Sequence, residues 1–468
     1  MLIEECPYIE PLDAYGAFTA YADSHLLDSG DRDRHAYIVV NPLHKITAKN
    51  GQVMQDGLPV PGKPMDVLAA LLAGFEQDHR DDLPPFQGGA LGYFGYELVH
   101  QLENLPRADT DWLDVPDMAV GIYDVVIAFD RIDRRMWLIS TGIPEFRGSK
   151  RDKRAADRLA MIRKYLRLAR PLGDVPTVPH HPDIIPWQSN FDRESYEGAV
   201  GRVVDYIHAG DIFQANLSQC FRAEYSIGNV PERFGLYRRL TDLSPAPFGA
   251  FLNFGDLAIV SNSPERFLKV TGRQVETRPI KGTRPRGTTP LEDANFAQEL
   301  MVSVKDRAEN VMIVDLLRND LSKVCAPHSV KTPDICALES FANVHHLVST
   351  VTGSLADGKT ALDLLEACFP GGSITGAPKI RAMEIITELE QLTRGPYCGA
   401  IGFIGFDGVM DTSIAIRTLT IRGGRMAFNV GGGIVADSIP AAEYEETLTK
   451  AARLFAALGI PETGGRTA

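Results

Sequence analysis

Acidic residues stand in pairs at helical spacing in two segments of the chain. Asp306 and Glu309 are three residues apart in the segment that begins KDRAENVMIV, and Glu443 and Glu446 are three apart in the one that begins EYEETLTK. Residues at this spacing share one face of a helix. The first pair extends an apolar stripe, where burying an unpaired carboxylate costs on the order of several kcal/mol. These carboxylates therefore need a cation or strong hydrogen-bond donors.

Two helices with paired acids could hold one magnesium ion. Mg²⁺ takes oxygen ligands, keeps waters and is commonly bound by one or two carboxylates together with an anionic substrate. The sequence has no cluster of histidine and cysteine that suggests zinc. For the second helix an alternative stays open, in which Glu443, Glu446 and Lys450 form a solvated face. They lie away from the expected apolar stripe of that helix, which is Leu448, Ala452, Phe455 and Leu458 or Gly459.

A basic segment accompanies these acids in a chain of formal net charge −13. RPIKGTRPRG (278–287) holds four cations, and its prolines and glycines predict a turn or loop. Such a loop suits an anionic ligand, and Lys281 is its only lysine. Directly before the second acidic helix, a glycine triplet permits close approach of the backbone to a ligand; its members are Gly431, Gly432 and Gly433.

The stretch PGGSITGAPKIRAMEII (370–386) has the pattern of a glycine loop followed by a helix, with Pro378 suited to the helix start. Gly376 is followed by Ala-Pro-Lys, so the stretch lacks the GxxxxGK[ST] pattern of a phosphate-binding loop. An anion bound at this helix N-terminus and a tight structural turn are the two alternatives.

The bulk composition limits the classes of protein. At 468 residues, 44% hydrophobic and 23% charged, the chain is an ordinary globular protein with room for two or three domains or one large fused core. The negative net charge argues against a general nucleic-acid-binding protein. Six scattered cysteines without a CxxC pair indicate reduced thiols in a cytoplasmic protein. The acidic N-terminus is unlike a signal peptide, and no stretch approaches the about 20 apolar residues of a membrane span.

Two helices and a linker are predicted near the middle of the chain. An amphipathic helix is expected over 151–170 and another from Asp192 to His208. Between them, five prolines occur in the twenty residues of 171–190, which makes this the best linker candidate. We place a boundary near residue 185.

Two segments far apart in the chain have similar sequences. GALGYFGYE (89–97) and GAIGFIGFD (399–407) agree at four positions and differ conservatively at the other five. They are either a chance match of glycine-rich strands or the trace of a duplication that places two similar sheets in one molecule. Strands such as YDVVIAFD, MWLIS, GAFLNF, LAIVSNS and IAIRTLTI follow one another without an intervening helix. We therefore predict an α+β fold with large antiparallel sheets.

Many collinear motifs resemble the chorismate-utilising enzymes, the family of anthranilate synthase component I, isochorismate synthase and aminodeoxychorismate synthase component I. The matching stretches are GDIFQANLSQ, SPERF, RPIKGTRPRG, DRAENVMIVDLLRNDL, VHHLVSTVTG, PGGSITGAPKIRAMEII, DTSIAIRTL and GGGIVADS followed by EYEET, and they cover about residues 190–455. PFQGGALGYFGYE resembles the family's N-terminal half. The resemblance implies two similar, interleaved α+β halves with large, mainly antiparallel sheets flanked by helices, and an active site between them. Residues 1–185 would be the N-terminal region and 186–460 the chorismate-binding catalytic region.

The lysine of the basic segment separates the branches of this family. Anthranilate and isochorismate synthases generally carry alanine where this chain has Lys281, and the PIKGT form resembles aminodeoxychorismate synthase component I. That resemblance implies amination of chorismate at C4, giving 4-amino-4-deoxychorismate for 4-aminobenzoate and folate synthesis. Glu265 would be the general acid and base, and Lys281 would attack the ring covalently, with electrostatic stabilisation of the substrate as its alternative role. Nearby Arg278 or Arg284 could help to depress the lysine pKa.

Further roles follow from the resemblance alone. Glu309 and Glu446 would bind Mg²⁺ directly, and Glu443 and Asp306 through water. His346 would be an active-site histidine, and its neighbour His345 structural. The implied substrate contacts are Gly282, Thr283, Tyr397, Arg417, Gly431, Gly432, Gly433 and Lys450.

The family resemblance also implies a partner. None of the six cysteines stands in G-x-C-x-G, so a separate glutamine amidotransferase would supply ammonia, in a heterodimer. Relatives have a tryptophan pocket, marked by LLES and NPSPY, where this chain has HLLDSG (25–30) and SPAPFG (244–249). The alternatives to the proposed activity are anthranilate synthase component I, isochorismate synthase and a non-catalytic protein that only binds chorismate.

Overall fold

The computed structural model of the chain describes residues 1–30, 34–75, 77–146, 148–168, 187–225, 230–341 and 344–460. The boundary placed near residue 185 and most of the proline-rich segment around it lie outside these residues.

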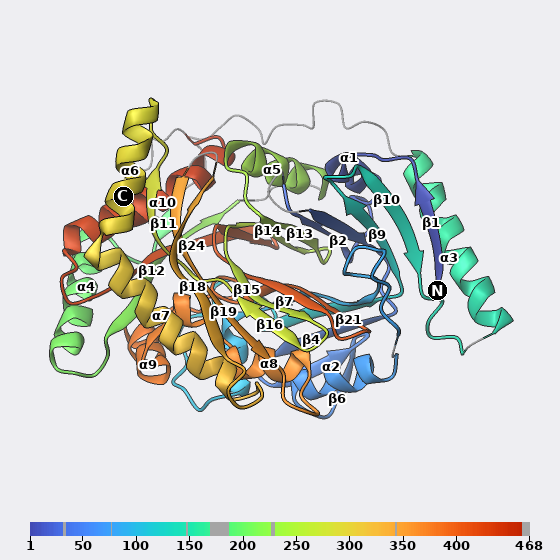
Figure 1. The fold of residues 1–468 in the computed structure, drawn as a ribbon, viewed down its shortest axis with the longest axis horizontal. Helices are drawn as coiled ribbons and strands as arrows, with labels where there is room; N and C mark the ends of the chain where they lie inside the picture. Colours follow the sequence, from blue (N-terminus) through green and yellow to red (C-terminus); the bar gives the residue numbers. More distant parts are fainter. Residues whose placement is uncertain are drawn as a thin grey trace.

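Two twelve-stranded sheets form the centre of the molecule (Figure 1). Neighbouring strands run antiparallel in both. The first sheet has the order β1 (Leu2–Cys6), β10 (Arg135–Ser140), β9 (Val125–Asp130), β3 (His35–Val39), β2 (Ser24–Asp28), β13 (Phe248–Asn253), β14 (Leu257–Ser263), β23 (Thr418–Arg422), β24 (Arg425–Ile434), β12 (Gln214–Glu224) and β11 (Gln188–Ser189), with β20 (Gly376–Ala377) also paired to β12.

The second sheet has the order β17 (Ile280–Pro285), β19 (Val344–Ser354), β16 (Gln274–Thr277), β15 (Arg266–Thr271), β22 (Met410–Ile414), β21 (Ala400–Gly405), β7 (Gly89–Phe94), β8 (Met118–Tyr123), β4 (His44–Lys49), β5 (Gln52–Gln55) and β6 (Leu58–Val60), with β18 (Lys331–Ser340) also paired to β19. Each sheet thus takes strands from both sides of residue 185. The predicted α+β fold with interleaved halves is confirmed.

Helices flank the sheets (Figure 1). They are α1 (Pro11–Gly16), α2 (Pro64–Ala73), α3 (Ser149–Leu168), α4 (Arg193–His208), α5 (Val230–Leu243), α6 (Pro290–Val302), α7 (Val304–Ser322), α8 (Ala361–Cys368), α9 (Lys379–Glu390) and α10 (Pro440–Ala457), with short 3₁₀ helices η1 (Tyr96–Gln101) and η3 (Gly372–Ile374). The predicted helices over 151–170 and 192–208 correspond to α3 and α4. No helix in the described part of the chain is long and apolar enough to cross a membrane.

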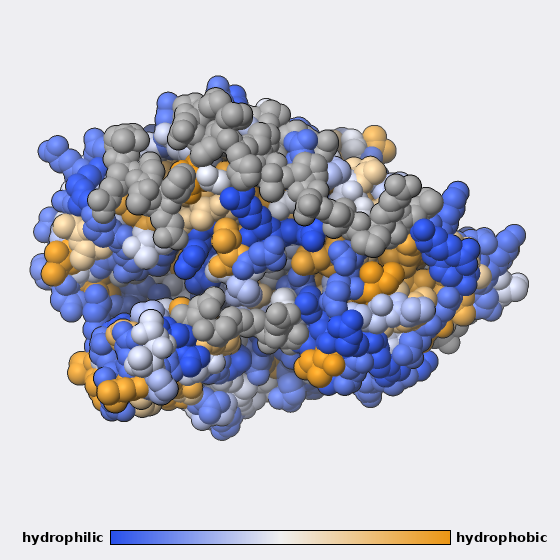
Figure 2. Space-filling view, turned by 90° about the horizontal axis from the view of Figure 1, so that it is seen from above, coloured by the Kyte–Doolittle hydropathy of each residue, from blue (hydrophilic) through white to orange (hydrophobic). Residues whose placement is uncertain are grey.

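Three apolar cores hold these layers together. One lies between the sheets and includes Tyr37, Tyr93 and Phe403. A second packs the first sheet against α5 and α10, and a third packs the second sheet against α2, α7 and α8. The face seen from above in Figure 2 is mainly hydrophilic, and its hydrophobic residues form small separate groups.

The two segments of similar sequence are neighbours in the second sheet. β7 pairs with β21 so that Gly92 lies opposite Gly402, Gly89 opposite Gly405 and Phe94 opposite Ala400. The duplication hypothesis placed these segments in two similar sheets, whereas the structure pairs them in one. Small residues are required here, because a Cβ atom at Gly402 would lie 2.1 Å from the carbonyl oxygen of Asp411.

Two predicted elements differ in the structure. The segment IAIRTLTI is not one strand, because the chain leaves β22 in the second sheet and enters β23 in the first. Arg417 lies in this crossing with a positive φ of 51°. RPIKGTRPRG is not a loop: residues 280–285 form β17, which pairs with β19 and has an irregular register between Lys281 and Thr283. Gly282, at φ 79°, accommodates this bulge.

The buried face of α10 also differs from the predicted stripe. Glu443, Thr447, Ala451 and Leu454 are buried, whereas Leu448 and Ala452 are only half-buried. Glu443 therefore lies on the packed face of the helix and is not on a solvated one. Phe455 and Leu458 of the predicted stripe are buried, at 7% and 2% exposure. The prediction is therefore right for the C-terminal half of the helix and wrong for the N-terminal half, where the polar Glu443 and Thr447 take positions that apolar residues usually fill.

We expect Gly402→Ala to destabilise the protein, because its methyl group would overlap the backbone of β22. The expected loss in free energy of unfolding is about 1–3 kcal/mol or more, measured by urea denaturation. Gly198→Ala is the matched control: Gly198 is an exposed position in α4 where an added methyl group would have no atom within 4 Å, so it should be stabilising by about 0.5–1 kcal/mol. Equal stability of the two variants would contradict the close packing of β21 on β22.

Candidate active site

The predicted site residues are carried by four neighbouring elements and the loops beside them. Lys281, Gly282 and Thr283 lie on β17, and Asp306 and Glu309 lie in the first turns of α7, which packs on β17 and β19. The remaining acids lie on α10, which packs on β24 next to the glycine triplet. Charge effects link the two groups, since both Glu309 and Glu446 raise the pKa of Lys281.

Lys281 and Glu265 are joined through one serine. The Nζ of Lys281 donates to the carbonyl oxygen of Ser373 at 3.0 Å, and the Oγ of Ser373 donates to Oε1 of Glu265 at 2.6 Å. Glu265 is buried at 6% exposure, as is Ser373. A basic amine and a carboxyl group are therefore held on opposite sides of a single residue, in the loop that the glycine-rich stretch forms.

Burial moves both ionisable groups toward their neutral forms. It raises the pKa of Glu265, although the Ser373 hydroxyl and the Lys281 charge act in the opposite direction. Burial likewise lowers the pKa of Lys281, against the pull of Glu309 and Glu265 and with the help of Lys450. A protonated carboxyl group can act as a general acid and a neutral amine as a nucleophile, so these shifts suit both roles.

The three arginines of the basic segment are engaged elsewhere. Arg278 pairs with Glu339, Arg284 with Glu299 and Asp306, and Arg286 forms a two-pronged pair with Asp293. We expected Arg278 or Arg284 to depress the pKa of Lys281. The structure instead assigns this effect mainly to burial, with Lys450 as the contributing cation.

The acids of α10 converge on the glycine triplet. A Cβ atom at Gly432 would lie 3.2 Å from Oε1 of Glu446 and 3.3 Å from Oε2 of Glu443. Lys450 donates to the carbonyl oxygen of Gly431 and to Glu446, at 2.7 Å each. Burial favours a higher pKa for Glu446, but the Lys450 charge lowers it overall. The predicted ion pair between Glu446 and Lys450 is present, and both side chains are solvated, at 51% and 46% exposure, although they lie beside the glycine triplet.

The acids of α7 lie close enough to those of α10 for their ionisation to be affected. Burial raises the pKa of Glu309; the charges of Lys281 and Lys305 act against this shift, and those of Asp306 and Glu443 add to it. Burial also raises the pKa of Glu443, whose Oε1 accepts a hydrogen bond from Ser438 at 2.7 Å. Carboxylates that disfavour one another's ionisation form a site for an added cation.

The carboxylates fit a magnesium ion only in an open site. In the described residues, no three acidic, histidine or cysteine side chains are arranged to hold a metal by themselves. Mg²⁺ commonly uses one or two carboxylates and completes its shell with water and an anionic ligand. The carboxylate oxygens of Glu443 and Glu446, both close to Gly432, are compatible with that arrangement.

The two neighbouring histidines have different surroundings. Nδ1 of His346 lies 2.8 Å from the Oγ1 of Thr283, directly across the ladder between β17 and β19. His345 points to the other side, with Nε2 2.9 Å from Asp293 and Nδ1 2.8 Å from Ser340. His346 thus lies beside the predicted site, and His345 is held between α6 and β18.

Tyr397 and Arg417 lie at the crossing between the sheets, whose backbone is hydrogen-bonded to that of Glu265. The N–H of Ile414 donates to the carbonyl oxygen of Glu265 at 3.0 Å, and the N–H of Cys398 donates to that of Ala415 at 2.9 Å. Burial raises the pKa of Tyr397 well above its usual range and lowers that of Arg417. A half-buried guanidinium here favours an anionic ligand.

Sequence reasoning did not single out Ser373 or Gln214. Both stood inside quoted motifs, but only the fold shows that Ser373 bridges Lys281 and Glu265. The buried side-chain amide of Gln214 lies over Gly433, where a Cβ atom would be 2.5 Å from its Nε2, and it has no hydrogen-bond partner in the described part of the protein. For Ser373 the available signal was a polar residue in a glycine-rich stretch.

The stretches HLLDSG and SPAPFG meet at a separate cavity between the sheets. This cavity, of about 300 Å³, is lined by Leu27, Asp28 and Ser29 from the first stretch and by Pro247 and Phe248 from the second. It does not include any of the predicted catalytic or metal-binding residues.

Comparisons with known proteins identify the family of the chain. Residues 23–456 match the family described as chorismate binding enzyme. The chain is 42% identical to aminodeoxychorismate synthase component 1 of Escherichia coli, over 92% of each chain. It is 40% identical to anthranilate synthase component 1 of Thermus thermophilus, over 97% of this chain and 96% of that one.

A solved structure is similar along most of the chain. Anthranilate synthase component I from Streptococcus pneumoniae superposes with a TM-score of 0.80 at 33% identity, covering 90% of this chain and 92% of that one. The family match, these identities and this shared fold show that the chain belongs to the chorismate binding enzymes.

Proposed function

We propose that this chain aminates chorismate at C4 with ammonia and so forms 4-amino-4-deoxychorismate, the precursor of 4-aminobenzoate and folate. The observation that carries the proposal is Lys281, linked through Ser373 to the buried Glu265. Similarity to aminodeoxychorismate synthase component 1 of two further bacteria, at 42% and 46% identity, supports it. Anthranilate synthase component 1 is the second candidate, because relatives with that name are almost as similar.

The chemistry divides one difficult substitution into two. Hydroxide is a poor leaving group, so Glu265 donates a proton to the C4 hydroxyl, which departs as water. The neutral amine of Lys281 forms a bond to C2 as the C4–O bond breaks and the ring double bond shifts. Ammonia then bonds to C4, the C2–N bond breaks, and the amine of Lys281 is released. Glu265 recovers its proton from the new C4 ammonium group.

The other side chains hold the substrate. Arg417 and Tyr397 would bind the enolpyruvyl carboxylate, with Arg417 able to bind it through two parallel hydrogen bonds. Gly282, Thr283 and the backbone of Gly431–Gly433 would contact the ring of chorismate. Lys450, which donates to the carbonyl oxygen of Gly431, would contact the substrate beside the acids of α10. His346 would lie near the reacting groups, held by its contact with Thr283.

Glu309 and Glu446 would hold Mg²⁺ directly, and Glu443 and Asp306 would do so through water. When bound, the ion would neutralise the ring carboxylate of chorismate. A separate glutamine amidotransferase would supply the ammonia. The "component 1" in the names of the relatives implies a second component in those proteins, which supports a partner of this kind.

The product of the reaction tests the proposal. Incubation of the protein with chorismate, magnesium chloride and ammonium chloride should give 4-amino-4-deoxychorismate, detected by liquid chromatography and converted to 4-aminobenzoate by an added lyase. Fluorescent anthranilate with pyruvate would refute the proposal in favour of the second candidate. Isochorismate formed without ammonium would refute both.

Covalent catalysis has its own signature. In Glu265→Gln, loss of the acid and base should lower kcat by about 10²–10⁴-fold. Incubated with chorismate in the absence of ammonium, the wild-type protein and, more slowly, this variant should accumulate an adduct of chorismate less one water, seen by intact-mass spectrometry. The matched control carries both Glu265→Gln and Lys281→Ala and should form none. If Lys281→Ala alone kept full amination activity, the lysine would have only an electrostatic role.

The dependence of activity on pH tests the effect of the Ser373 hydroxyl on the pKa of Glu265. The Ser373 hydroxyl lowers the pKa of Glu265, so Ser373→Ala should raise that pKa. Because Glu265 must be protonated to donate to the C4 hydroxyl, the alkaline limb of the profile of kcat/KM against pH should then move to higher pH, by about one pH unit. Ser373→Thr retains the hydroxyl and should keep the limb in place. An unmoved limb in Ser373→Ala would show that Glu265 does not titrate in this limb.

A further inference from the structure

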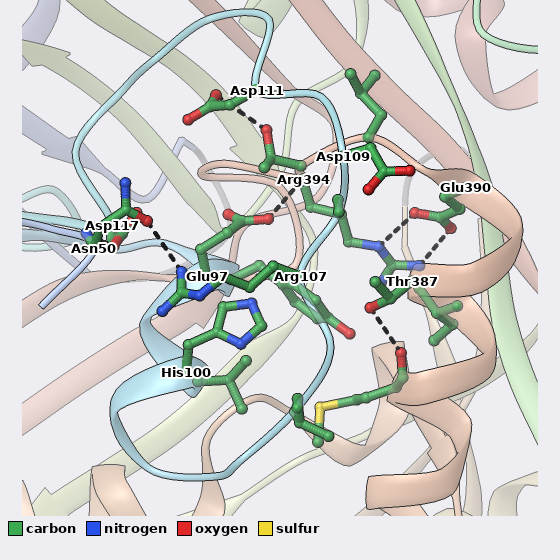
Figure 3. A pocket seen from close by; sticks show the side chains of 18 of the residues that line it. Asn50, Glu97, His100, Arg107, Asp109, Asp111, Asp117, Thr387, Glu390 and Arg394 are labelled. Carbon is green, nitrogen blue, oxygen red and sulfur yellow. Dashed lines mark hydrogen bonds and ion pairs between the residues drawn. The ribbon is translucent and has the colours of Figure 1, made fainter.

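A second polar cavity lies behind the catalytic groups. It has a volume of about 190 Å³ and is enclosed by η1, residues 105–117 and the C-terminal half of α9 with the turn that follows it (Figure 3). None of the residues assigned above to the reaction lines it. We call it the Glu97 cavity, after the carboxylate at its centre in Figure 3.

Negative charge dominates the Glu97 cavity. Its lining has five carboxylates, those of Glu97, Asp109, Asp111, Asp117 and Glu390, against three cations, those of Lys49, Arg107 and Arg394. Two of the cations are held by acids within the lining: Lys49 by Asp111, and Arg394 by Glu390 through two hydrogen bonds. Burial lowers the pKa of His100 to about 4, so its imidazole is neutral. The cavity therefore favours a cation over an anion.

Two buried polar atoms in this lining lack a partner. The hydroxyl of Tyr96, a residue 6% exposed, and Nδ1 of His100 have no hydrogen bond to any described residue. The guanidinium carbon of Arg394 lies 4.8 Å from the centre of the Tyr96 ring, and Arg394 makes no hydrogen bond to the Tyr96 hydroxyl. An unsatisfied buried polar group costs about 1–3 kcal/mol. A bound molecule with N–H donors would remove that cost.

Glu97 offers acceptor atoms beside them. Its Oε1 accepts the N–H of Arg394 at 2.7 Å and its Oε2 that of Gly395 at 2.8 Å. Each oxygen has a second lone pair for a ligand. Burial raises the pKa of Glu97 to about 7, and the charges of Asp117 and Asp111 contribute to this shift, so an added cation would be stabilised here.

One layer of side chains separates the Glu97 cavity from Lys281. The guanidinium of Arg394 donates from Nη1 to the carbonyl oxygen of Ile374 at 3.2 Å and from Nη2 to that of Asn216 at 2.6 Å. Ile374 directly follows Ser373, the residue that holds Lys281 and Glu265. The same arginine lies 5.7 Å from the ring of Tyr397. A small species in the cavity is thus on the far side of Arg394 from the reacting groups.

We propose that the Glu97 cavity binds an ammonium ion, the nitrogen source of the amination, which gives one proton to Glu97 and moves on as ammonia toward Glu265. The ion's single positive charge and four N–H donors match the excess of carboxylates and the unpartnered acceptors. This inference rests on the proposed function in that it requires an ammonia-using reaction. It does not depend on whether C4 or another ring carbon receives the nitrogen.

Tyr96→Phe is the sharpest test, because the lost hydroxyl has no partner among the described residues and its removal should leave stability unchanged. Steady-state rates are measured with the full chain at saturating chorismate, while ammonium chloride replaces sodium chloride at constant ionic strength. Tyr96→Phe should raise the KM for ammonium roughly tenfold and leave the KM for chorismate unchanged. Glu97→Gln should raise the ammonium KM by at least as much.

Tyr237→Phe is the matched control, since it removes another buried hydroxyl without a partner in the described residues, at a position that does not line the cavity. It should leave the ammonium KM at the wild-type value. An unchanged ammonium KM in both Tyr96→Phe and Glu97→Gln would overturn the cavity assignment alone. Wild-type protein without any ammonium-dependent turnover would overturn the proposed function, and the cavity assignment with it.

Discussion

The structure of the site depends on keeping a lysine and a glutamate close together and away from water without letting them pair directly. Ser373 does this by presenting its carbonyl oxygen to Lys281 and its hydroxyl to Glu265. A direct ion pair would stabilise both charged forms and hold the lysine protonated. With a neutral residue between them, burial dominates both pKa values and moves each group toward the form that its proposed role requires.

Long-range strand pairing creates that arrangement. Glu265 lies between a strand of the first sheet and a strand of the second, and the chain crosses between the same sheets again at residues 415–417. Backbone hydrogen bonds join these crossings to each other. The paired strands β7 and β21 extend the second sheet next to them, and their glycines allow the close approach that a side chain would prevent. The interleaving of the two halves therefore serves the site directly.

The buried ion pair of Arg394 and Glu390 organises the other side of the site. Both side chains are almost fully enclosed, at 1% and 3% exposure, and such a pair is stable only when its remaining hydrogen-bonding groups are satisfied. Arg394 meets this condition through the carbonyl oxygens of Ile374 and Asn216, and Glu390 through Ser218. The pair thus holds the loop of Ser373 through the carbonyl oxygen of Ile374, and both of its side chains also line the Glu97 cavity.

The sequence by itself determined the local and chemical part of this protein. Helical spacing brought Asp306 to Glu309 and Glu443 to Glu446, and successive short strands indicated the α+β class, because these are properties of neighbouring residues. It did not determine that Glu443 and Thr447 belong to the buried face of α10, that RPIKGTRPRG contains an edge strand, or that IAIRTLTI divides between two sheets. Those features depend on packing and pairing with elements that lie far away along the chain. For the same reason only the tertiary structure placed Ser373 between Lys281 and Glu265, and showed that burial, more than the neighbouring arginines, lowers the pKa of the lysine.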